Sequence, residues 1–285
     1  MEKRPNIMNQ TQAKTAQRYV NPQGITIHTQ EDFAKMRAAG QLAAQVLDRV
    51  ALEVKPGVTT DSLNTLCHEM ITKAGATPAP LNYRGFPKSI CTSVNHVVCH
   101  GIPDDKKLKD GDIVNVDVTV IVDGWHGDTS RMFWVGKPSV KAQRLTQVTY
   151  DALMIGIEQV KPGATVGDIG AAIQEYVEKH NYGVVRDYCG HGLGLVFHSA
   201  PNILHYGTPG KGEVLEEGMF FTIEPMVNAG KADTILSKHD QWTVTTRDKS
   251  LSAQFEHSLA VTADGFEIFT QSPKGLHCPP YSIEA

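Results

Sequence analysis

The chain contains two copies of one pattern, and this repetition limits the folds that it can adopt. The stretch VKPGVT at 54–59 returns as VKPGAT at 160–165, and each copy lies between two segments with helical periodicity. Further along, LKDG at 108–111 is matched by LEEG at 215–218 with nearly the same spacing. Matches that keep the same order indicate an internal duplication. We therefore expect two similar halves, each with two helices followed by strands, around a shared cleft.

Local patterns predict the elements of the first half. Apolar residues at steps of three and four predict helices over about 30–54 and 60–75, the first of which is stopped by Lys55-Pro56-Gly57. The apolar run at 90–102 predicts one strand.

A predicted β-hairpin in this half carries two acidic side chains. Residues 113–122 alternate Val and Ile with polar residues, Asp123-Gly124 suits a tight turn, and 125–132 form the expected return strand. Asp117 stands among valines on the first strand, and Asp128 lies on the second. Each acid could simply cap a turn or pair with a surface lysine. Two buried carboxylates that face each other repel, however, and a divalent cation relieves the repulsion. The hairpin is therefore a candidate half of a metal site.

The second half supplies further candidate ligands. The duplication places Glu224 opposite Asp117, and Glu256 lies in another short strand-like run. His191 is flanked by glycines, which let a backbone approach closely. Four acids and one imidazole form an oxygen-rich set that suits two divalent ions about 3.5–4 Å apart with bridging carboxylates. The alternative is a hydrogen-bonded core histidine among surface acids.

The composition is that of an ordinary globular protein and argues against several functions. The formal net charge is −4 and no basic block occurs, so we expect neither nucleic-acid nor membrane-surface binding. No apolar run approaches the roughly 18 residues that span a bilayer, and we expect no signal peptide. The 5 cysteines form no C-x-x-C pair, which favours reduced thiols and a cytoplasmic location over a disulfide framework.

Six motifs resemble the signature set of the methionine aminopeptidases, more closely of the bacterial type I form. They are HGIP at 100–103, NVDVT at 115–119, HGDT at 126–129, GHG at 190–192, TIEPM at 222–226 and QFEH at 254–257. The resemblance covers about residues 29–270 and implies the α/β pita-bread fold: pseudo-two-fold duplicated halves with a central antiparallel β-sheet covered by helices. It also implies an aminopeptidase that removes the initiator methionine from nascent proteins when the second residue is small.

The resemblance assigns metal ligands as well. These are Asp117, Asp128, His191, Glu224 and Glu256. Asp128 and Glu256 would bridge both ions, His191 and Glu224 would complete one, and Asp117 would complete the other. Two cations make a bridging water or hydroxide a nucleophile near neutral pH and polarise the scissile carbonyl, while Glu224 would serve as general base. This donor set accepts Co, Mn, Fe or Zn.

Substrate-binding residues follow from the same resemblance. His100 and His198 are the expected catalytic histidines, which would donate hydrogen bonds to the substrate amide and a developing oxyanion; the alternative for each is a structural role. His126 receives no role. The expected methionine pocket, apolar with aromatic contacts to the sulfur, consists of Tyr83, Phe86, Cys91, Phe197 and Trp242. Pro80 stands where some relatives have a pocket cysteine.

Related enzymes also hold a monovalent cation, whose expected contacts here are backbone oxygens of Asn95 and Val97 together with Ser252. We expect the partners to be N-terminal peptides of nascent chains, met at the ribosome, and the enzyme to be a monomer. The predicted organisation is an extended or flexible arm at 1–28, one catalytic domain at 29–270 and a C-terminal tail at 271–285. The halves of the domain would be about 29–140 and 141–270.

Two other functions fit the same fold. A proline-specific aminopeptidase or dipeptidase uses the same ligand types but usually carries an extra N-terminal domain, whereas about 28 residues precede the first helix here. A non-catalytic, ribosome-associated adaptor of this fold typically lacks ligands, and none is missing here. Metal content and cleavage of a Met-Ala-Ser peptide separate these possibilities.

Overall fold

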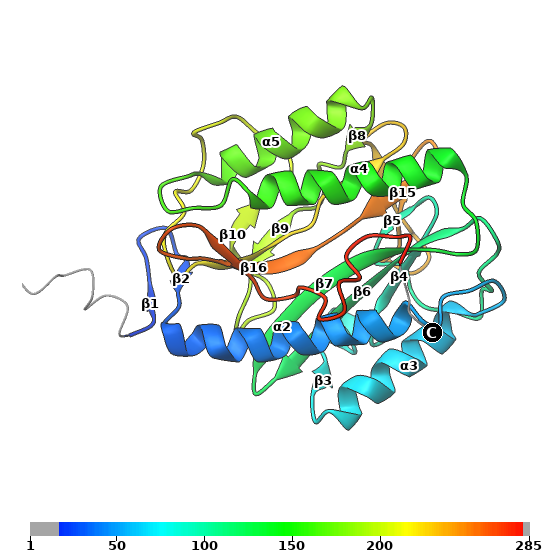
Figure 1. Cartoon of the computed structure of the whole chain (residues 1–285), viewed down its shortest axis with the longest axis horizontal. Coiled ribbons are helices and arrows are strands. Elements are labelled where there is room, and N and C mark those ends of the chain that lie inside the picture. The colour runs from blue at the N-terminus through cyan, green and yellow to red at the C-terminus, as the bar shows by residue number, and fades with distance from the viewer. Residues whose placement is uncertain (1–16, 282–285) are drawn as a thin grey trace, which may run out of the picture.

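Helices lie along the outside of antiparallel strands in the computed structural model, which describes residues 17–281 (Figure 1). The helices of this range are α2 (Gln30–Val50), α3 (Thr60–Lys73), α4 (Val140–Ile157), α5 (Val166–Lys179) and the short 3₁₀-helix η1 (Tyr83–Gly85). The strands are β1 (Tyr19–Val20), β2 (Thr26–Ile27), β3 (Thr77–Pro78), β4 (Cys91–Val94), β5 (Val97–Cys99), β6 (Ile113–Val122), β7 (Trp125–Trp134), β8 (Gly183–Val184), β9 (Gly190–Gly192), β10 (Ser199–Ile203), β11 (Phe220–Ile223), β12 (Met226–Asn228), β13 (Thr234–Leu236), β14 (Val244–Thr246), β15 (Ser252–Gln254), β16 (His257–Val261) and β17 (Phe266–Ile268). The predicted α/β class is confirmed.

The duplication is visible in the backbone. Gly57 donates its N–H to the carbonyl of Leu108 at 2.8 Å, and Gly163 donates to the carbonyl of Leu215 at 2.9 Å. The two glycines have nearly the same left-handed φ, +92° and +86°, which explains why glycine stands at this point of both copies. α2 and α3 of the first half thus correspond to α4 and α5 of the second.

The two predicted helices of the first half are confirmed, with ends a few residues earlier than expected. Thr29 caps α2 by accepting a hydrogen bond from the backbone of Asp32, whose carboxylate accepts one from Thr29 in return. The run at 90–102 does not form one strand. Asn95 adopts a left-handed φ of +56°, which the asparagine side chain tolerates, and this turn separates β4 from β5.

Each half buries its own apolar cluster beneath its own helices. In the first half, Val46 and Leu47 of α2 pack with valines of β6 such as Val118. In the second half, residues of α4 and α5 pack against β11 and β16. Ile25 and Ile27, from the segment predicted as an arm, belong to this second cluster and are buried. Residues 17–28 therefore pack on the domain through the β1–β2 pair, while residues 1–16 and 282–285 lie outside the described range. The division into arm, domain and tail stays a prediction.

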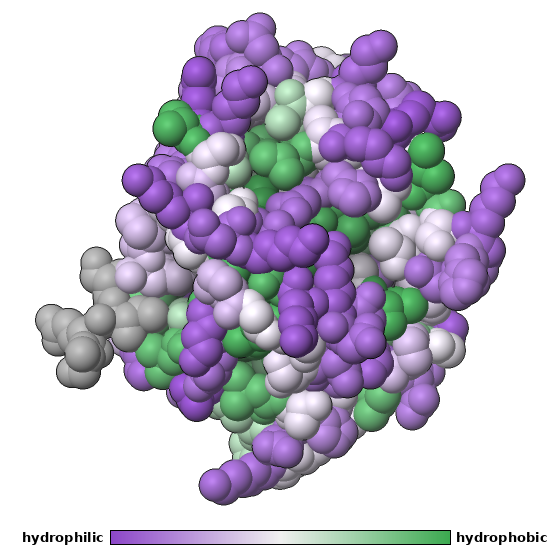
Figure 2. Space-filling view, turned by 90° about the vertical axis from the view of Figure 1, so that its right-hand side faces the viewer, coloured by the Kyte–Doolittle hydropathy of each residue, from purple (hydrophilic) through white to green (hydrophobic). Residues whose placement is uncertain are grey.

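The surface is largely hydrophilic on the face that Figure 2 displays, and hydrophobic side chains there are seen in separate groups between polar ones. Among residues 17–281, none of the helices combines the length and the apolar composition that crossing a membrane requires.

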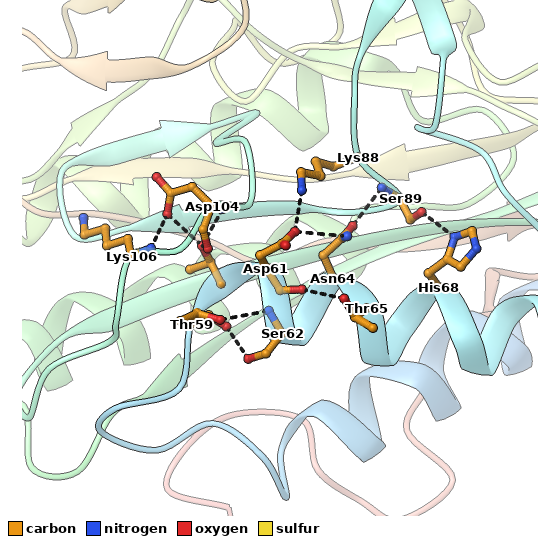
Figure 3. A network of polar contacts seen from close by, with 11 residues as sticks. Thr59, Asp61, Ser62, Asn64, Thr65, His68, Lys88, Ser89, Asp104 and Lys106 are labelled. Carbon is orange, nitrogen blue, oxygen red and sulfur yellow. Dashed lines mark hydrogen bonds and ion pairs between the residues drawn. The ribbon is translucent and has the colours of Figure 1, made fainter.

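A network of polar contacts ties α3 to the segment that leads into β4 (Figure 3). The Lys88 ammonium group contacts the Asp61 carboxylate, and Asn64 accepts a hydrogen bond from the backbone of Ser89 at 2.9 Å. The Ser89 hydroxyl lies 2.8 Å from Nδ1 of His68. These contacts fix the chain just before Cys91.

The two halves meet edge to edge beneath the site. Ser130 of β7 pairs with Glu256 across the halves, and the Thr129 hydroxyl donates to the Glu256 carbonyl at 2.7 Å. On the opposite side of β7, the fully buried Arg131 guanidinium forms an ion pair with Asp48 of α2 at 2.5 Å. The hydroxyl of Ser272 donates to the same carboxylate, so the C-terminal segment is joined to this pair.

We predict that Arg131→Ala lowers the free energy of unfolding by about 3–5 kcal/mol, because it leaves Asp48 charged and buried without its partner. Arg37→Ala is the control, since Arg37 pairs with Glu267 at the surface and exposed pairs contribute at most about 1 kcal/mol. Urea unfolding measures the free energy of unfolding of both variants. Equal losses in the two variants would contradict the prediction.

Candidate metal centre and substrate pocket

The five predicted metal ligands line one cavity of about 480 Å³. They come from both halves: Asp117 from β6, Asp128 from β7, His191 from β9, Glu224 from the end of β11 and Glu256 from the residue before β16. Ligand atoms of Asp128, His191 and Glu256 all lie within 4.8 Å of one another. Nε2 of His191 is 3.6 Å from Oδ2 of Asp128 and 3.7 Å from Oε1 of Glu224.

The register of the β6–β7 hairpin explains how its two acids meet. Thr119 lies directly opposite Asp128, and Asp117 lies opposite Ser130. Directly opposed residues share a face, as do residues two apart on one strand, so Asp117 and Asp128 point to the same side. The Thr119 hydroxyl also donates to Oδ1 of Asp128 at 2.7 Å, which orients that carboxylate.

Polar residues outside the predicted set orient Glu224. The Thr222 hydroxyl donates to its Oε1 at 2.9 Å, and the Gln254 amide donates to its Oε2 at 3.2 Å. Thr222 and Gln254 each lie two residues before a ligand in the sequence, a spacing that could have identified them. The backbone N–H of Glu224 donates to Nε2 of His205 at 3.1 Å. Burial lowers the pKa of His205 to about 3, which keeps this ring a neutral acceptor.

Asp128 and Glu256 are buried and Asp117 and Glu224 are half-buried, and these four carboxylates have too little positive charge around them to balance their own. Burial, together with the charges of Asp128 and Glu224, raises the pKa of Asp117 well above its usual range, and the pKa of Glu256 is raised in the same way. Burial raises the pKa of Glu224 to about 7. Burial alone would lower the pKa of His191, but Asp128 and Glu224 outweigh it and the pKa is raised.

This charge balance fits a metal site. Within residues 17–281, none of the four carboxylates pairs with a lysine or arginine. Buried carboxylates without such partners are costly unless they are protonated or bind a cation. Oxygen ligands with one imidazole suit divalent transition metals, so the residues present fit the expected group.

The two expected catalytic histidines line the same cavity. Burial lowers the pKa of His100, whereas burial and the neighbouring His191 ring lower the pKa of His198 to about 4. Both rings are therefore neutral near pH 7. Nδ1 of His198 lies 3.0 Å from the Tyr83 hydroxyl, and its ring centroid lies 4.2 Å from that of His191.

The five expected methionine-pocket residues also lie in the wall of this cavity, as does Pro80. Phe86 and Trp242 meet edge to face at 5.2 Å, and the Tyr83 and Phe197 rings are 4.9 Å apart. Burial raises the pKa of the Cys91 thiol well above its usual range, so this residue is a neutral, polarizable part of the wall. Tyr188, Met226 and Cys99 also line the cavity, and sequence analysis gave them no role. Their positions beside ligand-bearing motifs are the only sequence signal for them.

The residues expected to hold a monovalent cation are partly brought together. Ser252 donates its backbone N–H to the Asn95 carbonyl at 2.8 Å, and its hydroxyl donates to the Asn228 side chain at 2.9 Å. Val97 begins the adjacent strand β5. The cation itself stays a prediction.

Comparisons with known proteins identify the family of this chain. The model of metallopeptidase family M24 matches residues 34–263. The chain is 71% identical to the methionine aminopeptidase of Rickettsia prowazekii over 257 residues, which cover 90% of this chain and 99% of the relative. It is 55% identical to that of Escherichia coli over 248 residues, 86% of this chain and 94% of the relative.

A solved structure supports the same conclusion. The crystal structure of methionine aminopeptidase from Rickettsia prowazekii superposes with a TM-score of 0.86 at 71% identity, over 86% of this chain and 99% of that one. The fold and site thus define a metal-dependent peptidase. The chain belongs to metallopeptidase family M24 and, within it, to the methionine aminopeptidases. A prolidase from Pyrococcus horikoshii, at 21% identity and a TM-score of 0.68, shares the fold alone.

We predict that the metal-free protein loses stability relative to its Glu224→Gln variant as the pH rises from about 4.5 to 7. Glu224 loses its proton near its usual pKa of 4.5 when unfolded, but only near about 7 when folded without metal. At this carboxyl the folded state therefore binds more protons in this window, and its contribution to stability falls with rising pH until the folded carboxyl has ionised. Thermal unfolding in the presence of a chelator measures this.

In the Glu224→Gln variant this loss should be absent, because its side chain does not ionise. His198 and His205, whose lowered pKa values make stability rise with pH, are present in both proteins and cancel in the comparison. Protein loaded with Mn²⁺ should also lose less stability across the window, since the cation favours ionised ligands. A difference in midpoint between the metal-free wild type and Glu224→Gln that does not change with pH would refute the assignment of a raised pKa to Glu224.

Proposed function

We propose that this enzyme removes N-terminal methionine from nascent proteins whose second residue is small, with two divalent metal ions in the site. The observation that carries the proposal is the presence, in one cavity, of five ligand residues, three buried and two half-buried, beside an aromatic, thiol-containing pocket. Asp117, Asp128, His191, Glu224 and Glu256 would hold the ions. When bound, the ions would supply Lewis-acid polarisation of the scissile carbonyl and activation of a water.

The protein's own groups would then move the protons and stabilise charge. Glu224, held through both carboxylate oxygens by Thr222 and Gln254, would accept a proton and pass it to the leaving amine. His198 is neutral, and when its Nδ1 accepts from Tyr83 its proton lies on Nε2, where it can donate to a developing oxyanion. His100 would donate to the substrate amide.

The wall of the cavity would select the first residue of the substrate. A methionine side chain is unbranched and its sulfur favours aromatic edges at about 5 Å. Tyr83, Phe86, Phe197 and Trp242 surround such a space, with Cys91 at its wall. A proline-specific peptidase would need a different pocket, and a non-catalytic adaptor would not need the full ligand set.

We further propose a cytoplasmic, monomeric enzyme that meets its substrates as chains leave the ribosome. All five cysteines are free thiols, which suits a reducing compartment. The cellular metal would be Co, Mn, Fe or Zn, and a monovalent cation at Asn95, Val97 and Ser252 would complete the cofactors.

A peptide panel tests this function. Protein loaded with Mn²⁺ or Co²⁺ should release methionine from Met-Ala-Ser and Met-Gly-Ser peptides, and only poorly from Met-Glu-Ser. It should spare Ala-Pro-Ser, which a proline-specific aminopeptidase would cleave. Metal analysis should find two ions per chain. Efficient cleavage of Ala-Pro-Ser, or metal-loaded protein that releases no methionine, would refute the proposal.

We predict that His198→Ala lowers kcat by roughly 10²–10³-fold, the usual effect of losing one donor to a developing oxyanion. Its metal content should stay that of the wild type, because His198 is not among the proposed ligands. Steady-state kinetics and metal analysis on the same preparation check both points. A metal-replete variant with wild-type kcat would leave His198 with a packing role.

A further inference from the structure

The loop between β9 and β10, residues 193–198, carries Phe197 and His198 into the cavity. We infer that His126 is a positioning residue that holds this loop against the hairpin bearing Asp128, and so sets where Phe197 and His198 lie. The inference deepens the proposed function and rests on it, because it concerns two residues that would bind substrate.

His126 binds the start of the loop through the carbonyl oxygen of Gly194. Its backbone N–H donates to the carbonyl oxygen of Gly194 at 2.8 Å, and its Nδ1 lies 2.9 Å from the same oxygen. A carbonyl oxygen only accepts, so the ring proton must be on Nδ1. Both hydrogen bonds are buried, where a lost partner is costly. Gly194 is thereby tied to β7 two residues from a proposed metal ligand.

The same ring holds the end of the loop. It stacks on Phe197 with centroids 5.4 Å apart and an angle of 18° between the planes. Phe197 in turn lies 4.0 Å from the ring of His198 and 4.9 Å from that of Tyr83. His126 therefore contacts both the first anchor of the loop and the aromatic group next to the proposed oxyanion donor.

The middle of the loop is exposed, whereas Leu193 at its start is buried and donates its backbone N–H to the carbonyl of Phe220 at 3.3 Å. Leu195 and Val196, between the two anchors, are 46% and 59% exposed. Gly194 passes so close to the underlying rings that a Cβ there would lie 2.9 Å from His28 and 3.5 Å from Trp125. The carbonyl can reach His126 only because residue 194 is glycine.

Three variants of His126 test its hydrogen bond to Gly194 and its stacking on Phe197 separately. His126→Phe keeps a ring for Phe197 but loses the Nδ1 donor, whereas His126→Asn keeps an amide donor near that position but loses the stacked ring. His126→Ala loses both. His180→Ala is the matched control: Nδ1 of His180 lies 2.8 Å from the carbonyl of Tyr176 and their rings are 4.5 Å apart, far from the site at the end of α5.

Hydrogen–deuterium exchange of residues 193–198 reports the loop directly, while metal analysis and the kinetics of Met-Ala-Ser cleavage report the site. We expect His126→Ala to accelerate exchange in this loop and to lower kcat/KM roughly 10- to 100-fold, as misplaced substrate-binding groups do. Its metal content should be unchanged. The Phe and Asn variants should show intermediate losses, and His180→Ala should match the wild type.

The inference would be overturned if the His126 variants kept the loop exchange and the kcat/KM of the wild type. It would also be overturned if they had a lower melting temperature with unchanged kinetics, or if their activity fell in proportion to lost metal. If His126→Ala does not fold, the inference is tested with His126→Phe and His126→Asn, because these variants keep more of the side-chain volume. Failure of the proposed function is a separate result: the wild type would release no methionine, while loop exchange would still report whether His126 anchors the loop.

Discussion

The repulsion among four carboxylates, two buried and two half-buried, is the constraint on which the rest of this structure depends. Asp117 and Asp128 come from one half, and Glu224 and Glu256 from the other. Burial makes each charge costly, and their closeness makes the cost larger. The surrounding hydrogen bonds from Thr119, Thr222 and Gln254 orient the oxygens but cannot neutralise them. A bound cation can neutralise these charges. Paired strands from both halves of the molecule therefore converge at this point, where they hold the carboxylates in place.

Much of this arrangement could be predicted from the sequence, because it depends on local periodicity. The alternation of residues 113–122 places Asp117 on a defined face, and Asp123-Gly124 determines the register that brings Asp128 to the same face. The duplication then relates Glu224 to Asp117. These are properties of single elements, or of one element compared with its copy.

Other features depend on contacts between distant segments, which one sequence does not reveal. The bond from the Glu224 backbone to His205 joins a strand end to a neighbouring loop, and the His126–Gly194 contact joins residues 68 positions apart. The turn at Asn95 that separates β4 from β5 is a local feature. The apolar residues on both sides of it nevertheless led to the prediction of one continuous strand. Even the packed segment at 17–28 has only a few apolar side chains, such as Ile25 and Ile27, to distinguish it from a free arm.

The division of ligands between the two halves has a consequence for the timing of synthesis. A growing chain that has not yet reached residue 256 lacks one of the ligand atoms grouped around His191. The first half alone presents two aspartates and no imidazole ligand. The centre therefore arises only late in translation, when both halves are available to fold together. A copy that is still being made therefore lacks the complete set of proposed ligands until its second half has been synthesised.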